Sequence, residues 1–152
     1  MKFRPLTGLV AAAHTPFKSD GTLNLGVVEK QAAHFLQNKV PVAFIGGSTG
    51  ESHSLSLDER RKLAARWMAV AKGTKLKVIV HVGSNCVADA RTLAAHAQKI
   101  GAAAVSALAP CYFKPRHVDA LLDTCAQIAG GAPGLPFYFY DIPVLTGVSL
   151  SM

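Results

Sequence analysis

The chain has 152 residues, of which 50% are hydrophobic and 16% are charged. This length can bury one hydrophobic core, so we expect a single domain over residues 1–152. No apolar run reaches the roughly 18 residues that a transmembrane helix needs, and we expect no membrane partner. The net charge of +7 is a feature of many nucleic-acid-binding proteins, so this function has to be considered. However, the densest charged cluster, residues 58–62, mixes both signs. We interpret it as a solvated helix face with some attraction for small anions, and expect no nucleic-acid partner.

The N-terminal stretch, residues 1–17, has a short basic start followed by apolar residues, so a signal peptide is the alternative to a buried first strand. Pro5 and Gly8 interrupt the stretch early, and "TPF" stands where small residues should precede a cleavage site. We interpret the stretch as a strand. Without a signal peptide, a cytoplasmic location is expected.

The expected elements alternate along the chain between short apolar runs and longer amphipathic ones. In chain order they are a strand at 6–13, a helix at 25–39, a strand at 42–47, a helix at 56–73, a strand at 77–83, a helix at 87–101, a strand at 103–110, a helix at 116–130 and a strand at 136–143. Ser56 and Glu59 form a capping box, and Gly101 and Gly130 mark helix ends. The continuously apolar strands indicate burial on both faces, as in the parallel sheet of an α/β protein.

Two architectures use this alternation. A doubly wound sheet usually has a Gly-x-Gly-x-x-Gly turn after its first strand, whereas this chain continues with "HTPF". A (β/α)₈ barrel needs about 250 residues, more than the chain contains. The pattern by itself therefore leaves an open five-strand sheet and the front part of a barrel as alternatives.

Four motifs at strand ends, together with "AAAHTPF" on the first strand, resemble one family. They are "GGSTGES" (46–52), "HVG" (81–83), "APCYFKP" (109–115) and "YDIPVLTGV" (140–148). In this order the motifs resemble the N-acetylneuraminate lyase and dihydrodipicolinate synthase family of Schiff-base aldolases. The resemblance implies that the fold is the N-terminal five βα units of a (β/α)₈ TIM barrel, incomplete as given, with the C-terminal part of the domain missing.

The "GGSTGES" motif is the first candidate site. Ser48 and Thr49 follow a buried strand and precede a helix, where hydroxyls and backbone N–H groups can hold a carboxylate. The resemblance implies that Ser48, Thr49 and Gly50 bind the carboxylate of pyruvate. The alternative is a tight turn with no ligand. Glu51 is expected to cap the helix or pair locally.

Two tyrosines complete the candidate site. The resemblance makes Tyr140 the phenol that relays protons near the Schiff base, with Ser48 as a partner in the relay. Without the resemblance, the alternative for Tyr140 is a buried tyrosine that only packs in the core. Tyr112 matches a tyrosine that reaches the site of a neighbouring subunit, although "CYF" stands here where relatives often carry two adjacent tyrosines. The resemblance also implies a homo-oligomer, which is a tetramer in this family.

The chain is not expected to hold a metal or a cofactor. Its three cysteines, Cys86, Cys111 and Cys125, are widely spaced and form no Cys-x-x-Cys pair, which argues against a zinc site or a disulfide framework. His14 and His81 lie at strand ends without a nearby carboxylate. Packing or hydrogen bonding is the better interpretation of both histidines.

The family chemistry requires a lysine whose amine forms an imine with the keto acid. The resemblance places this lysine on a sixth strand, beyond position 152. Lys75 and Lys77 flank the wrong end of the third strand, Lys114 lies in a loop and Lys72 ends a helix. We therefore expect an N-terminal fragment that is inactive by itself.

The motifs resemble the lyase branch of the family more than the synthase branch. Leu145 follows Val144 where the synthase carries an arginine, and "HVG" replaces a glycine-threonine-glycine run. The expected reaction is cleavage of N-acetylneuraminate to pyruvate and N-acetylmannosamine, in sialic acid catabolism. The alternatives are dihydrodipicolinate synthase, another 2-keto acid aldolase of the family, and a non-catalytic truncated relative.

Overall fold

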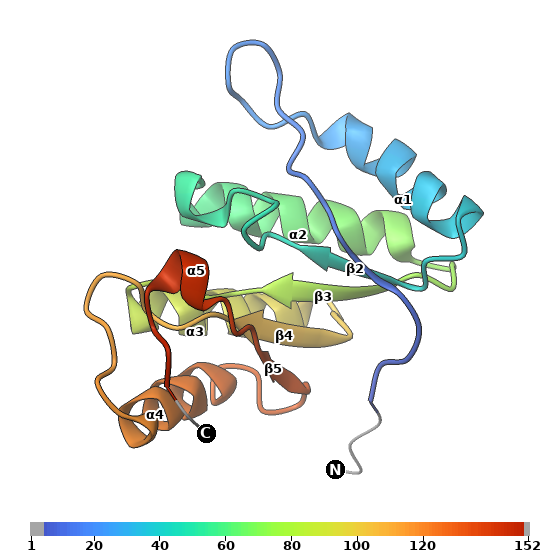
Figure 1. The fold of residues 1–152 in the computed structure, drawn as a ribbon. Coiled ribbons are helices and arrows are strands. Elements are labelled where there is room, and N and C mark those ends of the chain that lie inside the picture. The colour runs from blue at the N-terminus through green and yellow to red at the C-terminus, as the bar shows by residue number, and fades with distance from the viewer. Residues whose placement is uncertain (1–4, 151–152) are drawn as a thin grey trace.

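The computed structural model describes residues 5–150, which form one parallel sheet of five strands. The strand order is β1-β2-β3-β4-β5, and each neighbouring pair is parallel (Figure 1). The strands are β1 (Val10–Ala12), β2 (Val42–Ile45), β3 (Lys77–His81), β4 (Ala104–Ala107) and β5 (Phe137–Phe139). The predicted parallel sheet is therefore confirmed.

The helices lie in the order of the strands that they follow. They are η1 (Leu25–Val27), α1 (Val28–Gln37), η2 (Ser52–Ser54), α2 (Leu57–Ala71), α3 (Val87–Lys99), α4 (Val118–Ala129) and α5 (Pro143–Thr146). Helix α1 contacts α2, α2 contacts α3, and α3 contacts α4, so these helices form one continuous layer (Figure 1). A doubly wound sheet would carry helices on both faces. Consecutive strand order with one helical layer is the arrangement of a (β/α)₈ barrel, which decides between the two architectures.

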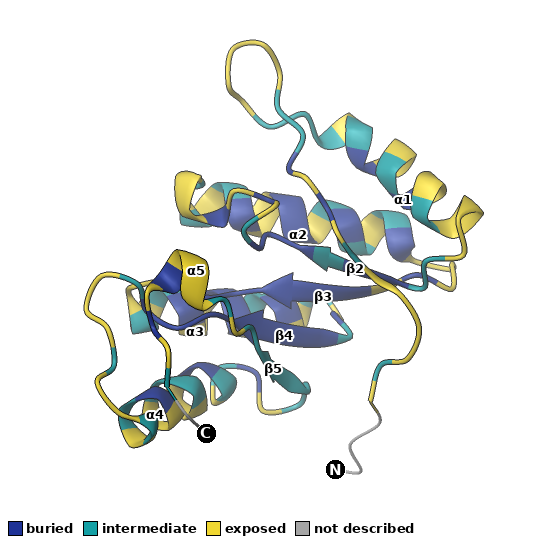
Figure 2. Cartoon of the chain, in the orientation of Figure 1, coloured by how far each residue is buried: buried dark blue, intermediate teal, exposed yellow. Residues whose placement is uncertain are grey.

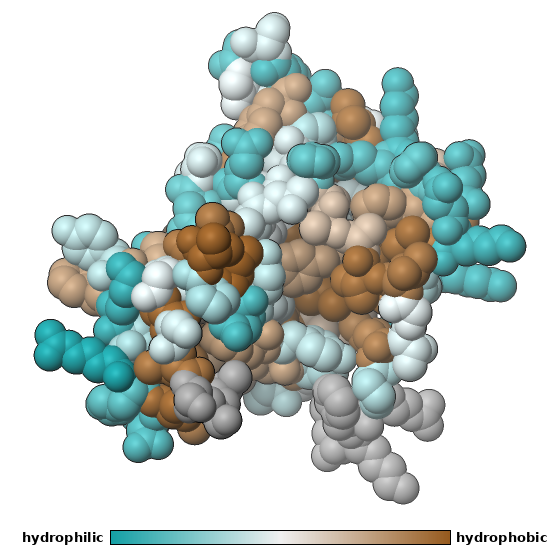
Figure 3. Space-filling view, viewed as in Figure 1, coloured by the Kyte–Doolittle hydropathy of each residue, from teal (hydrophilic) through white to brown (hydrophobic). Residues whose placement is uncertain are grey.

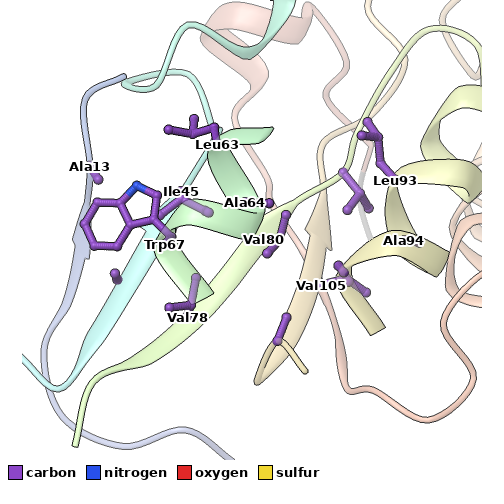
Figure 4. Packing of buried hydrophobic residues seen from close by; sticks show 14 of the residues in the cluster. Ala13, Ile45, Leu63, Ala64, Trp67, Val78, Val80, Leu93, Ala94 and Val105 are labelled. Atoms are coloured by element: carbon purple, nitrogen blue, oxygen red, sulfur yellow. The ribbon is translucent and has the colours of Figure 1, made fainter. Parts of the chain in front are cut away.

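The main core lies between the sheet and this helical layer. Trp67 from α2 is completely buried and sits near Ile45 and Val78, while Leu93 from α3 sits near Val105 (Figure 4). Figure 2 shows β3 and β4 as buried, together with part of α2, and the α3 residues Ala90, Leu93, Ala94 and Ala97 are buried as well. Burying a side chain of this size contributes about 1.5–3 kcal/mol, so the layer is held chiefly by hydrophobic packing.

The other face of the sheet is the barrel interior, and its core is small. Val42, Ile79 and Ala104 form its buried cluster. Strand β1 is the edge of the sheet, and no further strand covers it among the described residues. Val10 on β1 and Leu9 just before it keep 50% and 68% of their surface exposed. Figure 3 shows hydrophobic side chains at the surface over this segment and over α5. The described residues therefore leave apolar surface at one edge of the interior.

Local signals determined most element ends. The predicted capping box is confirmed, because the Ser56 hydroxyl accepts from the Glu59 N–H at 3.3 Å and the Glu59 carboxylate accepts from the Ser56 N–H at 2.9 Å. Gly101 has a φ of +82°, the left-handed conformation of a helix-ending glycine. Gly130 follows α4 in a right-handed conformation instead, with a φ of −60°.

The strands are shorter than the apolar runs that predicted them. The run 136–143 holds only the three residues of β5, and Pro143 opens the short helix α5. Proline has no N–H for the sheet and has a φ suited to the first position of a helix. Within residues 5–150, none of the helices has both the length and the apolar character that a membrane crossing requires.

Candidate functional site

The candidate residues gather at one edge of the sheet. The turn at 46–50 follows β2, His81 ends β3, and Tyr140 follows β5. The backbone N–H of Tyr140 donates to the carbonyl of Ala107 at 2.9 Å, so Tyr140 continues the β4–β5 pairing by one residue. Carboxyl ends of parallel strands meet at the same end of a barrel, which is where barrel active sites form.

The turn at 46–50 is closely packed against the end of β1. A Cβ on Gly50 would lie 3.0 Å from the nitrogen of Gly46 and 3.2 Å from the carbonyl oxygen of Ala13. The Thr15 hydroxyl donates to the Gly50 carbonyl at 2.6 Å and ties the turn to the end of β1. Gly46 has a φ of +63°. The glycines therefore make a tight turn, and the binding role expected for Gly50 stays a prediction.

Ser48 and Thr49 precede α2, which begins where the sequence predicted with Ser56 as its N-cap, but an intervening segment separates them from it. Glu51 adopts a left-handed conformation with a φ of 53°, a single 3₁₀ turn follows, and α2 begins only at Leu57. The Glu51 carboxylate, which was expected to cap the helix or pair locally, is exposed and makes no capping hydrogen bond. The N-terminus of α2 is therefore separated from Ser48 and Thr49 by residues 50–56, and the turn itself offers their hydroxyls to an anion.

Ser48, Thr49 and Tyr140 line one cavity of about 220 Å³. Its remaining walls are Val10, Ala12 and Phe44. The structure therefore brings together three of the predicted site residues, from β2 and β5, against an apolar background. The ring of Tyr140 meets that of Phe44 edge to face, with centroids 5.5 Å apart. A small, mainly apolar cavity lined by three hydroxyl-bearing residues suits a small acid with a short carbon chain.

A second cavity of about 280 Å³ is also lined by Ser48. Its walls come from the loop at 51–54, from α5 and from residues after β4, including Leu108 and Cys111. Ser52 in this wall is buried, and its hydroxyl has no hydrogen-bond partner among the described residues. Burial, and then the charge of Arg60, lower the pKa of His53. Ser48 thus borders both cavities.

Tyr112 does not join the other site residues within the chain. Its side chain is 76% exposed and stacks edge to face on Phe113, with centroids 4.9 Å apart. Its position is set by the backbone, because the Tyr112 N–H donates to the Asn85 side chain at 3.1 Å. Tyr112 and Phe113, which is 86% exposed, form a protruding aromatic pair.

His81 is hydrogen-bonded, as expected, and is only 1% exposed. Its Nδ1 lies 2.9 Å from the carbonyl oxygen of Gly46, and its Nε2 accepts from the Leu108 N–H at 3.3 Å. Nδ1 therefore carries the proton and donates to Gly46. His14 is exposed at the end of β1, and its carbonyl accepts from the Gln31 side chain at 3.0 Å. Among residues 5–150, no group of three or more His, Cys, Asp or Glu side chains is placed to hold a metal ion.

Arg60 is the residue that sequence reasoning missed. It lies in the charged run 58–62 that was interpreted as solvated, yet it is only 8% exposed. Its guanidinium donates to the carbonyls of Gly83 at 2.9 Å and His81 at 3.0 Å. Burial lowers the pKa of Arg60 to about 10, so the group stays charged at neutral pH. A signal was available, since position 60 shares a helical face with the apolar residues 63, 64 and 67.

The chain matches known proteins over almost all of its residues. The profile of the dihydrodipicolinate synthetase family matches residues 5–152. The N-acetylneuraminate lyase of Danio rerio is 42% identical over 150 residues, which are 98% of this chain and 49% of that protein. The structure of Proteus mirabilis N-acetylneuraminate lyase superposes with a TM-score of 0.91 at 40% identity, covering 98% of this chain and 49% of that chain.

Dihydrodipicolinate synthase from Cyanidioschyzon merolae, crystallised with lysine bound, has the same fold with a TM-score of 0.86, at 34% identity over 91% of this chain and 47% of that one. The chain thus spans about half the length of the curated relatives it matches. Its five strands correspond to the N-terminal βα units of the barrels in these relatives. The match over residues 5–152 and the shared barrel architecture place this chain in the dihydrodipicolinate synthetase family.

Proposed function

We propose that this protein acts as a class I aldolase that cleaves N-acetylneuraminate to pyruvate and N-acetylmannosamine. The observation that carries the proposal is the 220 Å³ cavity that Ser48, Thr49 and Tyr140 all line at the carboxyl edge of the sheet. Similarity to lyases at 42% and 40% identity supports the choice of substrate. Leu145, at the position where the synthase branch carries an arginine, supports the lyase branch.

Ser48 and Thr49 are proposed to hold the carboxylate of the keto acid. Their hydroxyls can each donate one hydrogen bond to a carboxylate oxygen, and such charge-assisted bonds are stronger than neutral ones. Val10, Ala12 and Phe44 supply apolar walls beside these hydroxyls, against which the carbon chain of the keto acid can pack. The turn then orients the keto acid relative to Tyr140.

Tyr140 is proposed as the general acid–base group. Cleavage of the carbon–carbon bond requires removal of a proton from the sugar hydroxyl, and the pyruvyl carbon later takes up a proton. A phenol beside a protonated imine can perform both transfers, because the neighbouring cation stabilises the phenolate. Ser48 lines the same cavity and is positioned to take part in the relay.

The imine requires a lysine amine, and neither cavity described above is lined by a lysine. We assign the Schiff-base lysine to a position outside residues 1–152, and treat these residues as one part of a single barrel domain. We further propose a cytoplasmic homo-oligomer in which Tyr112 reaches the cavity of a neighbouring subunit. The 76% exposure of Tyr112 supports this role, because a protruding aromatic ring is available to a partner.

The deciding experiment is borohydride trapping with pyruvate, on residues 1–152 and on the protein at its full natural length. We expect one reduced pyruvyl adduct on the full-length protein and none on residues 1–152. Release of N-acetylmannosamine from N-acetylneuraminate by the full-length protein should accompany the adduct. An adduct without sugar cleavage would favour another keto-acid aldolase of the family. A full-length protein without an adduct would refute the aldolase proposal.

A further inference from the structure

The buried side chain of His81 connects three strand ends. It belongs to β3, it donates to the carbonyl of Gly46 after β2, and it accepts from the N–H of Leu108 after β4. Its ring also meets the ring of Tyr140 edge to face, with centroids 6.1 Å apart. His81 does not line the 220 Å³ cavity, so it is not a ligand-contacting residue there.

The bond to Gly46 is the connection that matters for the cavity. Gly46 opens the turn that carries Ser48 and Thr49, and its own φ of +63° turns the chain there. At its other end the turn is tied to β1 by the Thr15 hydroxyl on the Gly50 carbonyl, at 2.6 Å. The turn is thus held at both ends, by a residue from β3 and by a residue after β1.

The position of His81 is itself set by its surroundings. Arg60 donates to the carbonyls of His81 and Gly83, which fixes the backbone at the end of β3. Gly83 leaves room for the imidazole, because a Cβ at that position would lie 2.8 Å from Nε2. Burial, and then the nearby positive charge of Arg60, lower the pKa of His81 to about 3 and keep the ring neutral. The neutral Nδ1–H tautomer is the one that both hydrogen bonds require.

We propose that His81 is a positioning residue that sets the Ser48–Thr49 turn for keto-acid binding through its hydrogen bond to Gly46. The inference rests on the proposed keto-acid function of the turn. It adds a contribution from β3, through a residue that touches no substrate, to a site built from β2 and β5.

Two amide substitutions separate the two hydrogen bonds. In His81→Asn the amide nitrogen can reach the position of Nδ1 and keep the bond to Gly46. In His81→Gln the longer side chain places its amide near the position of Nε2 and loses that bond. Each variant leaves one buried backbone group without its partner, so both should lose stability to a similar extent. A merely structural role would therefore affect the two variants alike.

The measurement is the Kd for pyruvate and the KM and kcat for N-acetylneuraminate, in the full-length protein. We expect His81→Gln to weaken pyruvate binding and raise KM by about 3- to 10-fold, the effect of one hydrogen bond, whereas His81→Asn stays within about twofold of wild type. His34→Gln on the exposed face of α1 is the matched control. Equal losses of binding in the two His81 variants would overturn the proposal.

Gly83→Ala provides a second test, in which residue 81 remains a histidine. The added methyl group pushes against the imidazole, so this variant should weaken pyruvate binding in the same direction as His81→Gln. Unchanged binding in a folded Gly83→Ala protein would contradict the positioning role.

Hydrogen exchange of the turn amides at 47–50, without ligand, separates this inference from the proposed function. Faster exchange in His81→Gln than in His81→Asn supports the positioning role even if wild-type protein binds no pyruvate, a result that would refute only the keto-acid function. Equal exchange in both variants would overturn the positioning role, whatever the wild-type protein binds.

Discussion

Acidification should destabilise this protein through His81. The group is 1% exposed, and burial together with the charge of Arg60 lowers its pKa from 6.5 to about 3. Between these two values the unfolded chain binds a proton at His81 and the folded chain does not. Stability therefore falls as the pH drops below 6.5, and the loss is complete only near pH 3.

The size of the effect follows from the shift. Each pH unit between the two pKa values contributes about 1.4 kcal/mol, so lowering the pH from 7 to 5 should cost about 2 kcal/mol from this residue. Arg60 stays charged over this range because its pKa is about 10. His53, with a pKa also lowered by burial, adds a loss in the same direction.

The assay is urea unfolding of the full-length protein at pH 7 and pH 5, for wild type and for His81→Asn. Because other groups titrate in both proteins, the quantity of interest is the difference between their two pH dependences. Wild type should lose about 2 kcal/mol more than His81→Asn. Identical pH dependences would refute the assignment of a neutral, buried His81.

Three further predictions concern the cavity and the sheet edge. Tyr140→Phe should keep the fold and some imine formation but reduce turnover by about 10²–10⁴-fold, as measured by steady-state kinetics alongside borohydride trapping; near-normal turnover would return Tyr140 to a core role. Ser48→Ala and Thr49→Ala should each weaken keto-acid binding by about 1–3 kcal/mol, and unchanged Michaelis constants would support the turn-only alternative. Residues 1–152 alone should be poorly stable or self-associating, because Val10 on the edge strand is 50% exposed; a cooperatively unfolding monomer in ultracentrifugation and thermal melts would contradict this.

Much of the fold was predictable because its signals are local. The alternation of apolar runs with amphipathic ones reports burial on both faces of a strand and one face of a helix, and it predicted all five strands. The Ser56–Glu59 box is complete within four residues, so it could be identified without tertiary contacts. The motif resemblance also selected Ser48, Thr49 and Tyr140, which the structure brings to one cavity. It also selected Tyr112, which lies outside that cavity.

The features that escaped prediction depend on residues far apart in the chain. Glu51 was expected to cap the helix or pair locally, but it adopts a left-handed conformation in the turn before α2 and makes no side-chain cap bond. Arg60 was interpreted as solvated because it lies in a run of charged residues. The sequence shows its charge directly, whereas its burial depends on the strand against which α2 packs. Its acceptors lie 21 and 23 residues away, at the end of β3.

The amino-acid sequence by itself therefore determined the order of the βα units and the capping box of α2, and it selected the candidate site residues. The tertiary structure alone decided which strand ends are joined, because hydrogen bonds such as those of His81 to Gly46 and Leu108 span 35 and 27 residues. Such bonds form only when parallel strands bring their carboxyl ends to one edge, where burial strengthens each bond and penalises any polar group left without a partner.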